Sequence, residues 1–185
     1  KSMSERKEFL TRQHEDILKS EENLTEIIRQ MTVKMEQQFK EQFAAIAKTF
    51  DRVFGQIFGG GHGILRMTEG QDSLEAGIEI IGQPPGKKVQ NMAALSGGER
   101  ALTAIALLFA IQQQHPAPFC ILDEIEAALD DVNVERFANY LKNMKDTQFI
   151  VITHRKGTMM VADTMYGVTM EEKGVSKCIS VRFTG

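Results

Sequence analysis

Residues 119–124 read FCILDE, an apolar run that ends in two carboxylates. A second apolar run, residues 149–154 (FIVITH), ends in a histidine. Continuous apolar runs of this length are typical of strands buried on both faces of a parallel sheet. A helical pattern at about residues 131–144 lies between the two runs and can supply the crossover that parallel strands need. The sequence therefore predicts an α/β fold, a mainly parallel sheet with flanking helices.

The flanking segments fit this scheme. Gly59-Gly60-Gly61 is expected to end a preceding helix, and residues 82–88 (GQPPGKK) are expected to form a loop. The other expected elements are strands at 63–68 and 75–81 joined by the polar turn 69–73, a helix over 97–113, a short helix or turn after Arg155, and closing strands at 163–169 and 176–183.

The N-terminal segment has a different composition. Residues 1–50 contain no Gly or Pro, and all 15 Gly and all four Pro come later. A helix of 50 residues would be about 75 Å long, which is longer than a small domain is wide, so a coiled coil is favoured over an amphipathic helix lying on a domain. We expect a coiled-coil arm at 1–51 and a globular lobe at 52–185. The apolar seam that predicts it comprises Met3, Leu10, Ile17, Leu24, Ile28, Met31, Met35, Phe39, Phe43, Ile46, Phe50, Val53 and Ile57.

The overall composition narrows the class of protein. The 185 residues are 42% hydrophobic and 25% charged, which is ordinary globular usage, and the net charge of −3 excludes a uniformly basic nucleic-acid binder. No apolar run reaches the roughly 18 residues of a membrane span, and no signal segment follows the first charges. The two cysteines belong to no metal-binding cluster. We therefore expect a cytoplasmic protein without membrane contact, and the initial Lys leads us to expect part of a longer chain.

The two carboxylates after the first apolar run are candidates for metal and acid–base chemistry. At the carboxyl end of a parallel strand, where α/β folds bind ligands, Asp123 can hold a hydrated Mg²⁺ and Glu124 can orient and deprotonate a water. Both reach one phosphate only if the chain turns sharply after Asp123, since neighbouring strand residues point to opposite faces. The alternative is a strand that runs into an acidic, helix-capping turn.

The motif LSGGER, residues 95–100, is a candidate phosphate site. Ser96 is a plausible N-cap, Gly97 and Gly98 allow close approach of a ligand to the backbone, and Glu99 suits the positive end of the helix dipole. Helix N-termini of this kind bind phosphate. The alternative is an ordinary Ser-Gly-Gly helix cap.

Two further residues can each have either a ligand-binding role or a purely structural one. His154, at the tip of the second apolar strand, can reach a γ-phosphate or can be a half-exposed loop histidine. Asp130, in the sequence ALDD at 128–131, can face a ligand or can simply cap the next helix.

The order of these motifs resembles the ATP-binding cassette superfamily: a signature motif, a Walker B strand, a D-loop and a switch histidine. More closely, four stretches are similar to the C-terminal half of the head of SMC (structural maintenance of chromosomes) proteins in their bacterial and archaeal form. These stretches are FGGGHGILRMTE (58–69), residues 84–111, residues 116–141, and TQFIVITHRKGTM (147–159). The resemblance covers about residues 40–185.

The resemblance implies roles by position. Asp123 would coordinate Mg²⁺, Glu124 would be the general base, and His154 would contact the γ-phosphate and the attacking water. Ser96, Gly97 and Gly98, with Glu99 at the same helix start, would face ATP held by a second head. Asp130 would couple the two sites across that interface.

One family motif is missing. The Walker A pattern G-x-x-x-x-G-K-[ST] does not occur, and the nearest string, residues 82–88, has three intervening residues and Lys in place of Ser or Thr. In the family that motif lies in the N-terminal half of the protein, so this chain would hold half of a nucleotide site.

The resemblance also implies partners: the N-terminal lobe of the same protein, a second head, a kleisin subunit and DNA. Lys87, Lys88, Arg155 and Lys156 are candidate DNA contacts. The implied function is ATP-driven head dimerisation in chromosome organisation. The alternatives are a transporter cassette, which would not begin with a heptad helix, a coiled-coil DNA-repair ATPase of the same superfamily, and a non-catalytic interaction module.

Overall fold

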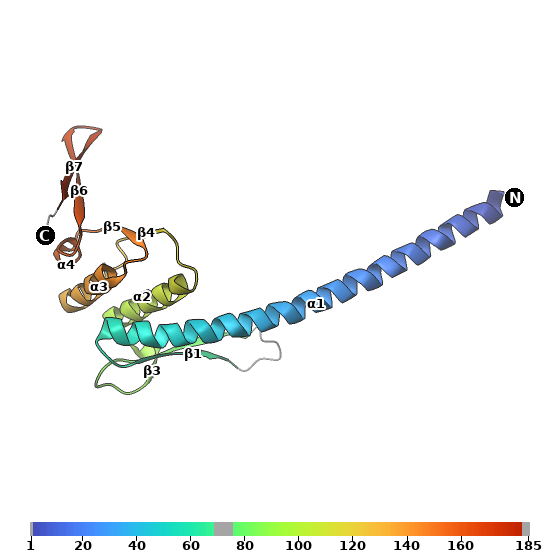
Figure 1. Ribbon diagram of the computed structural model, residues 1–185, viewed down its shortest axis with the longest axis horizontal. Helices are drawn as coiled ribbons and strands as arrows, with labels where there is room; N and C mark the ends of the chain where they lie inside the picture. Colours follow the sequence, from blue (N-terminus) through green and yellow to red (C-terminus); the bar gives the residue numbers. More distant parts are fainter. Residues whose placement is uncertain (1, 69–75, 183–185) are drawn as a thin grey trace. The chain divides into compact units, whose positions relative to one another are not determined.

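The computed structural model describes residues 2–68 and 76–182. Figure 1 shows its elements, which agree with the predicted helices and strands to within a few residues, except that the short strand at 90–91 and the 3-10 turn at 92–94 were not predicted. The turn expected at 69–73, residue 75 and residue 183 lie outside the described residues. In chain order the elements are α1 (Ser2–Phe58), β1 (His62–Met67), β2 (Ile78–Gln83), β3 (Gln90–Asn91), the 3-10 turn η1 (Met92–Ala94), α2 (Gly97–Gln114), β4 (Phe119–Asp123), α3 (Asp131–Asn143), β5 (Gln148–Ile152), α4 (Lys156–Met159), β6 (Thr164–Glu172) and β7 (Val175–Arg182).

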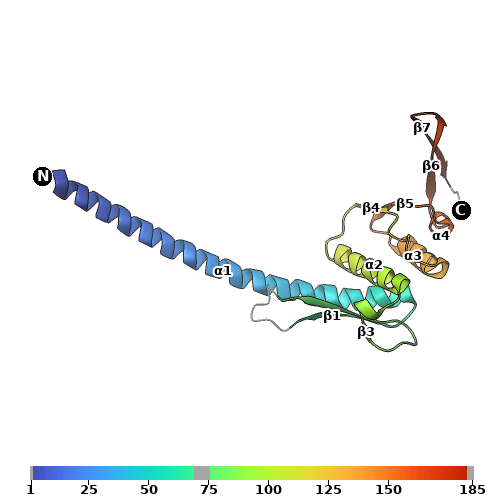
Figure 2. The same cartoon turned by 180° about the vertical axis from the view of Figure 1, so that it is seen from behind.

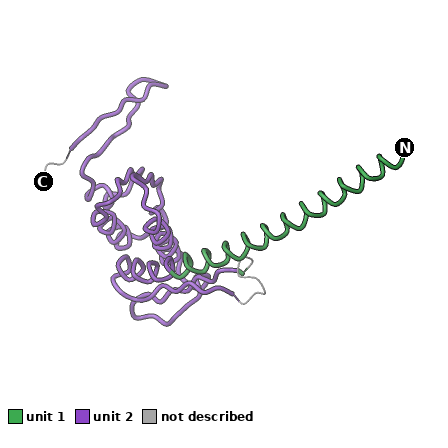
Figure 3. The backbone as a smooth tube through the Cα atoms, turned by 45° about the vertical axis from the view of Figure 1, so that its right-hand side comes forward, with its two compact units in different colours: residues 1–44, 70–76 green, residues 45–69, 77–185 purple. Residues whose placement is uncertain are grey.

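The chain divides into two compact units, residues 1–44 with 70–76 and residues 45–69 with 77–185, which Figure 3 distinguishes by colour. The helix α1, 57 residues long, contributes to both. Among the described residues, none of the helices is long and apolar enough to cross a bilayer.

In the first unit, the apolar seam of α1 is exposed to solvent from Met3 to Met35, and Phe39 and Phe43 are half-buried. The seam residues Met3, Leu10, Ile17, Leu24 and Met31 are between 53% and 86% exposed. Pairs one turn apart, such as Arg12 with Glu8 at 2.7 Å, support the helix locally, but an exposed surface pair contributes little stability. A regular apolar stripe that stays exposed along a helix is typical of a surface that pairs with another helix.

In the second unit, the last turns of α1 form the centre of the core. Phe50, Val53, Phe54 and Ile57 are fully buried, and the rings of Phe54 and Phe58 stack at 4.0 Å between centroids. Figures 1 and 2 show β1–β3 on one side of these turns and α2 and α3 on the other, between α1 and the β4–β5 pair. The end of α1 is thus a structural part of the globular unit.

A second aromatic cluster fixes the position of β5. The ring of Phe109 on α2 lies 6.2 Å from Phe137, 5.2 Å from Tyr140 and 6.0 Å from Phe149, measured between centroids. Aromatic rings at such spacings bury large areas and favour defined relative orientations. The cluster joins α2 and α3 to the inner face of the strand that leads to His154.

The expected α/β fold with flanking helices is confirmed, but in residues 2–68 and 76–182 the parallel pairing is limited to one pair of strands. β4 pairs with β5 in parallel, whereas β1–β2–β3 and β6–β7 are separate antiparallel sheets. The reason lies in the connections: among the paired strands of the described residues, only β4 and β5 are joined through a helix, α3, whereas β6 and β7 are joined by a two-residue turn. The result is a mixed α/β fold.

The glycines at 59–61 end α1 and set the direction of β1. Gly59 (φ +72°) follows the last helical residue, and the amide of Gly60 donates to the carbonyl of Gly55 at 2.7 Å, as in a Schellman C-cap. Gly61 also has a positive φ of +82°, and a Cβ added there would lie 2.1 Å from the carbonyl oxygen of Gln83. The absence of a side chain at Gly61 therefore allows its backbone to lie close to the backbone of Gln83.

We predict that Gly61→Ala destabilises β1 and β2 more than Gly59→Ala. Both substitutions place a side chain at positive φ, which costs about 1–2 kcal/mol, but only position 61 also meets backbone, since nothing lies within 4 Å of a Cβ at Gly59. Hydrogen exchange of the β1 and β2 amides measures the difference. Equal exchange rates of these amides in the two variants would show that the close approach of Gly61 to Gln83 does not affect the stability of β1 and β2.

Candidate functional site

The parallel pairing of β4 with β5 brings two of the predicted residues together. Asp123 pairs with Ile152, and the amide of Glu124 donates to the carbonyl of Ile152 at 3.0 Å. The carboxylate oxygen Oε1 of Glu124 consequently lies 3.2 Å from Nδ1 of His154. A carboxylate that faces one ring nitrogen orients the imidazole and leaves Nε2 for a second partner.

The chain turns sharply after Asp123, as the use of both carboxylates requires. Glu124 has φ +47° and is, within the described residues, the one non-glycine residue with positive φ. Its carbonyl accepts from the amide of Ala127 at 3.0 Å, which starts the tight turn toward α3. A left-handed side-chain-bearing residue costs about 1–3 kcal/mol, and such strain is concentrated at functional sites. Asp123 and Glu124 are both exposed at this end of β4.

The start of α2 is held by a charged contact from the preceding loop. Ser96 is the N-cap of α2, and its amide and hydroxyl both donate to Oε2 of Glu99, at 3.2 and 2.7 Å. The ammonium of Lys87 lies 2.8 Å from Oε1 of the same carboxylate. The hydrogen bond from Lys87 is the main reason why the pKa of Glu99 is lowered below its usual range.

Two of the four candidate DNA contacts have partners inside the chain. Lys87 pairs with Glu99, and the guanidinium of Arg155 donates to Leu129 O at 2.7 Å and to Asp131 at 3.1 Å. Lys88 and Lys156 are exposed. Lys87 and Arg155 therefore have a structural explanation that does not require a nucleic acid.

Asp130 caps a helix and lies beside the start of α2. Its Oδ1 accepts from the amide of Asn133 at 2.9 Å, and its Oδ2 accepts from the Asn133 side chain at 3.2 Å. A Cβ added at Gly98 would lie 3.7 Å from the carbonyl of Ala128 and 3.8 Å from the Asn133 amide nitrogen. The structure thus brings the residues of LSGGER close to the turn that holds Asp130.

The predicted residues therefore form two groups. Glu124 and His154 form one, and the residues at the start of α2 lie with Asp130 in the other. Within the described ranges, no hydrogen bond or ion pair joins Ser96 or Glu99 to Glu124 or His154.

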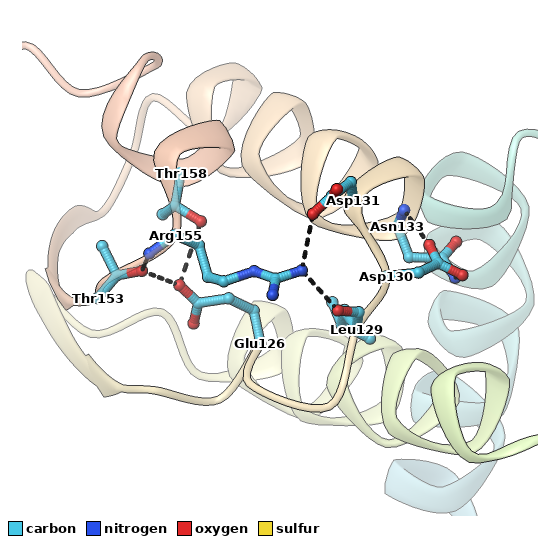
Figure 4. Close-up of polar contacts among 8 residues, drawn as sticks. All are labelled: Glu126, Leu129, Asp130, Asp131, Asn133, Thr153, Arg155 and Thr158. Atoms are coloured by element: carbon cyan, nitrogen blue, oxygen red, sulfur yellow. Dashed lines mark hydrogen bonds and ion pairs between the residues drawn. The ribbon is translucent and has the colours of Figure 1, made fainter.

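The sequence analysis missed a buried carboxylate two residues after Glu124. Glu126 is only 1% exposed, and its Oε1 accepts from the hydroxyls of Thr153 and Thr158, the latter at 3.1 Å. Figure 4 shows this cluster together with Arg155, which reaches toward Leu129 and Asp131. The other oxygen of Glu126 has no partner among the described residues. The available sequence signal was a single carboxylate among the small and apolar residues of IEAAL, 125–129.

Comparison with known proteins identifies the family. A sequence profile described as "RecF/RecN/SMC N terminal domain" matches residues 5–177. The chain belongs to the RecF/RecN/SMC family. It is 58% identical over 181 residues to the chromosome partition protein Smc of Bacillus subtilis (strain 168), which is 97% of this chain and 15% of that protein. The chain thus spans about 15% of the length of this curated relative.

Solved SMC structures share the fold. A chain from "Structural biochemistry of ATP-driven dimerization and DNA stimulated activation of SMC ATPases" matches with a TM-score of 0.72 and 44% identity over 79% of this chain and 89% of that chain. The Smc head domain of Pyrococcus furiosus, solved with an extended coiled coil and bound to the C-terminal domain of ScpA, matches with a TM-score of 0.74 and 42% identity over 87% of this chain and 40% of that chain. The mixed α/β fold with its long helix is therefore the fold of SMC head domains.

Asp123 is the candidate metal ligand among the described residues of this SMC chain. No group of three or more metal-ligating side chains gathers within residues 2–68 and 76–182. Mg²⁺ commonly takes one or two protein carboxylates and fills its other positions with water and phosphate oxygens. The exposed carboxylate of Asp123 at the end of β4 fits that role, and a bound Mg²⁺ would neutralise phosphate charge there.

We predict that Lys87→Met raises the pKa of Glu99 toward the usual glutamate value of about 4.3. A lowered carboxylate pKa adds stability above the unfolded pKa, and this contribution is lost as the pH falls through the folded pKa. In Lys87→Met the folded pKa lies closer to the unfolded value, so this contribution is smaller and stability depends less on pH in this range. A carbon-13 titration of the Glu99 carboxyl group measures the shift, with the neighbouring Lys88→Met as control. An unchanged pKa in Lys87→Met would mean that Lys87 does not act on Glu99 in solution.

Proposed function

We propose that this chain is the C-terminal lobe of the ATP-hydrolysing head of an SMC protein that acts in chromosome condensation and segregation. The observation that carries the proposal is the pair of Glu124 and His154 at the carboxyl ends of two parallel strands. Oε1 of Glu124 lies 3.2 Å from Nδ1 of His154, and the backbone of Glu124 is in a left-handed conformation. A carboxylate and an imidazole fixed in this way are suited to position and deprotonate a water.

The motif content supports the C-terminal rather than the N-terminal lobe. The description of the matching family names an N-terminal domain, but the chain contains no G-x-x-x-x-G-K-[ST]. It contains instead the residues that follow this motif in ATP-binding cassettes, from LSGGER to His154. This lobe would therefore supply Ser96, Gly97, Gly98 and Glu99 to one nucleotide and Asp123, Glu124 and His154 to another. We place the coiled-coil arm at 1–51 and the lobe at 52–185.

The exposed face of the β4–β5 pair supports a covering lobe. Parallel strands are usually buried on both faces, yet Phe119, Ile121, Ile150 and Ile152 are between 47% and 58% exposed. The N-terminal lobe of the same protein is the partner that would cover this face, and its helix would pair with the seam of α1.

The further partners are a second head, a kleisin subunit and DNA. Among the described residues, no hydrogen bond or ion pair joins Ser96 or Glu99 to the Glu124–His154 pair, which supports an arrangement in which each head completes the site of the other. The similarity to a head bound to ScpA supports a kleisin partner. The proposed location is the cytoplasm, in association with the nucleoid, and the substrate is ATP with Mg²⁺.

The first test is Glu124→Gln in the full-length protein. Glutamine keeps the size of the side chain and can hold a water, but it cannot accept a proton, so hydrolysis should fall by about 10²–10⁴-fold. ATP binding should persist and paired heads should accumulate in ATP and Mg²⁺. Single-turnover hydrolysis and the dimer fraction measure this, with the exposed Glu135→Gln on α3 as a matched control. Hydrolysis at the parent rate would remove Glu124 as the base and make His154 the leading candidate.

The second test is Ser96→Arg, which probes head pairing separately from ATP binding. The exposed Ser96 faces the nucleotide of the other head in this proposal, and a long side chain would occupy that space. ATP binding should be unchanged and ATP-dependent dimerisation should be lost, as seen by sedimentation. Ser4→Arg, at the far end of α1, controls for the added charge. Normal dimerisation of Ser96→Arg would contradict a role in trans.

A further inference from the structure

The segment that carries His154 is attached to the segment that carries Glu124 and Asp130 at two points. The first is the buried Glu126, whose Oε1 accepts from Thr153 and Thr158. The second is Arg155, whose guanidinium donates to Leu129 O and to Asp131 Oδ1. His154 lies between the two attachments, since Thr153 precedes it and Arg155 follows it.

The hydroxyl of Thr153 makes two hydrogen bonds, one as donor and one as acceptor. It donates to Glu126, and it accepts from the amide of Arg155 at 3.0 Å. One hydroxyl therefore closes the backbone turn around His154 and also ties that turn to a carboxylate buried from solvent. Because a buried carboxylate has little freedom and gains from each donor it holds, this contact restricts the position of the turn.

We propose that Glu126 and Thr153 are positioning residues that hold the imidazole of His154 against Glu124 for ATP hydrolysis. This inference rests on the proposed function. Glu126 lies two residues beyond Glu124, so the same tight turn that presents Glu124 also presents the anchor of the His154 segment. Neither Glu126 nor Thr153 needs to touch substrate, and both act through the imidazole.

Thr158 provides a matched comparison within the same cluster. Its hydroxyl donates to the same Oε1 of Glu126 at 3.1 Å, but it belongs to α4 and is 4% exposed. Thr153→Val and Thr158→Val therefore each remove one donor to one oxygen and keep the shape of the side chain. Only Thr153→Val releases the turn around His154.

The experiment measures ATP hydrolysis by the full-length protein and its variants. Thr153→Val should lower kcat by about 10–100-fold with KM unchanged, because misplacement of a catalytic group by about 1 Å has effects of this size. Thr158→Val should stay close to the parent kcat, and Thr153→Ser, which restores the hydroxyl, should recover it. In a His154→Ala background, Thr153→Val should cause no further loss.

A second readout is independent of activity. Thr153→Val removes the acceptor of the Arg155 amide, so hydrogen exchange of residues 153–155 should accelerate, and Thr158→Val should leave it unchanged. Equal losses of kcat in the two valine variants, or a loss that persists in His154→Ala, would overturn the positioning role. A parent protein that does not hydrolyse ATP would refute the proposed function before any substitution is made, so the two failures are distinguishable.

Discussion

The parallel pairing of β4 with β5 is the constraint on which the arrangement of the lobe depends. Because the strands run in the same direction, their carboxyl ends meet at one edge, and residues 30 positions apart in the chain, Glu124 and His154, come within 3.2 Å. Parallel pairing requires a crossover, and α3 supplies it while its Phe137 packs with Phe109 against the inner face. The helices between the strands are therefore needed for the site as well as for the core.

Most of the elements could be predicted because they follow from local rules. The apolar runs, the glycines after α1 and the caps at Ser96 and Asp130 are readable signals, and each lies where the sequence placed it. The sheet pairing was less predictable, since the strand pattern of β6 does not specify the direction of its partner. The two-residue turn between β6 and β7 makes these two strands antiparallel.

The supporting contacts of the site could not be predicted from the sequence. Lys87 and Glu99, and Glu126 and Thr153, are 12 and 27 residues apart, and no spacing rule joins them. Lys87 and Arg155 resembled nucleic-acid contacts because the sequence shows no partner for a cation in a loop. Only the fold shows that their charges are used within the chain, where each fixes a turn next to a proposed ligand-facing residue.

These supporting contacts differ in how much freedom they leave to the residues they hold. Asp130 uses both carboxylate oxygens on Asn133, so a contact with another head would compete with the cap of α3, which is worth about 1 kcal/mol. The hydroxyl of Ser96 is bound to Glu99, which Lys87 holds from a separate loop. A group that approached Ser96 would therefore disturb a surface contact, whereas one that used the side chain of Asp130 would loosen a helix. If position 130 couples two heads, as proposed, that coupling would cost less through the backbone of the Leu129–Asp130 turn, which Arg155 already connects to the His154 segment.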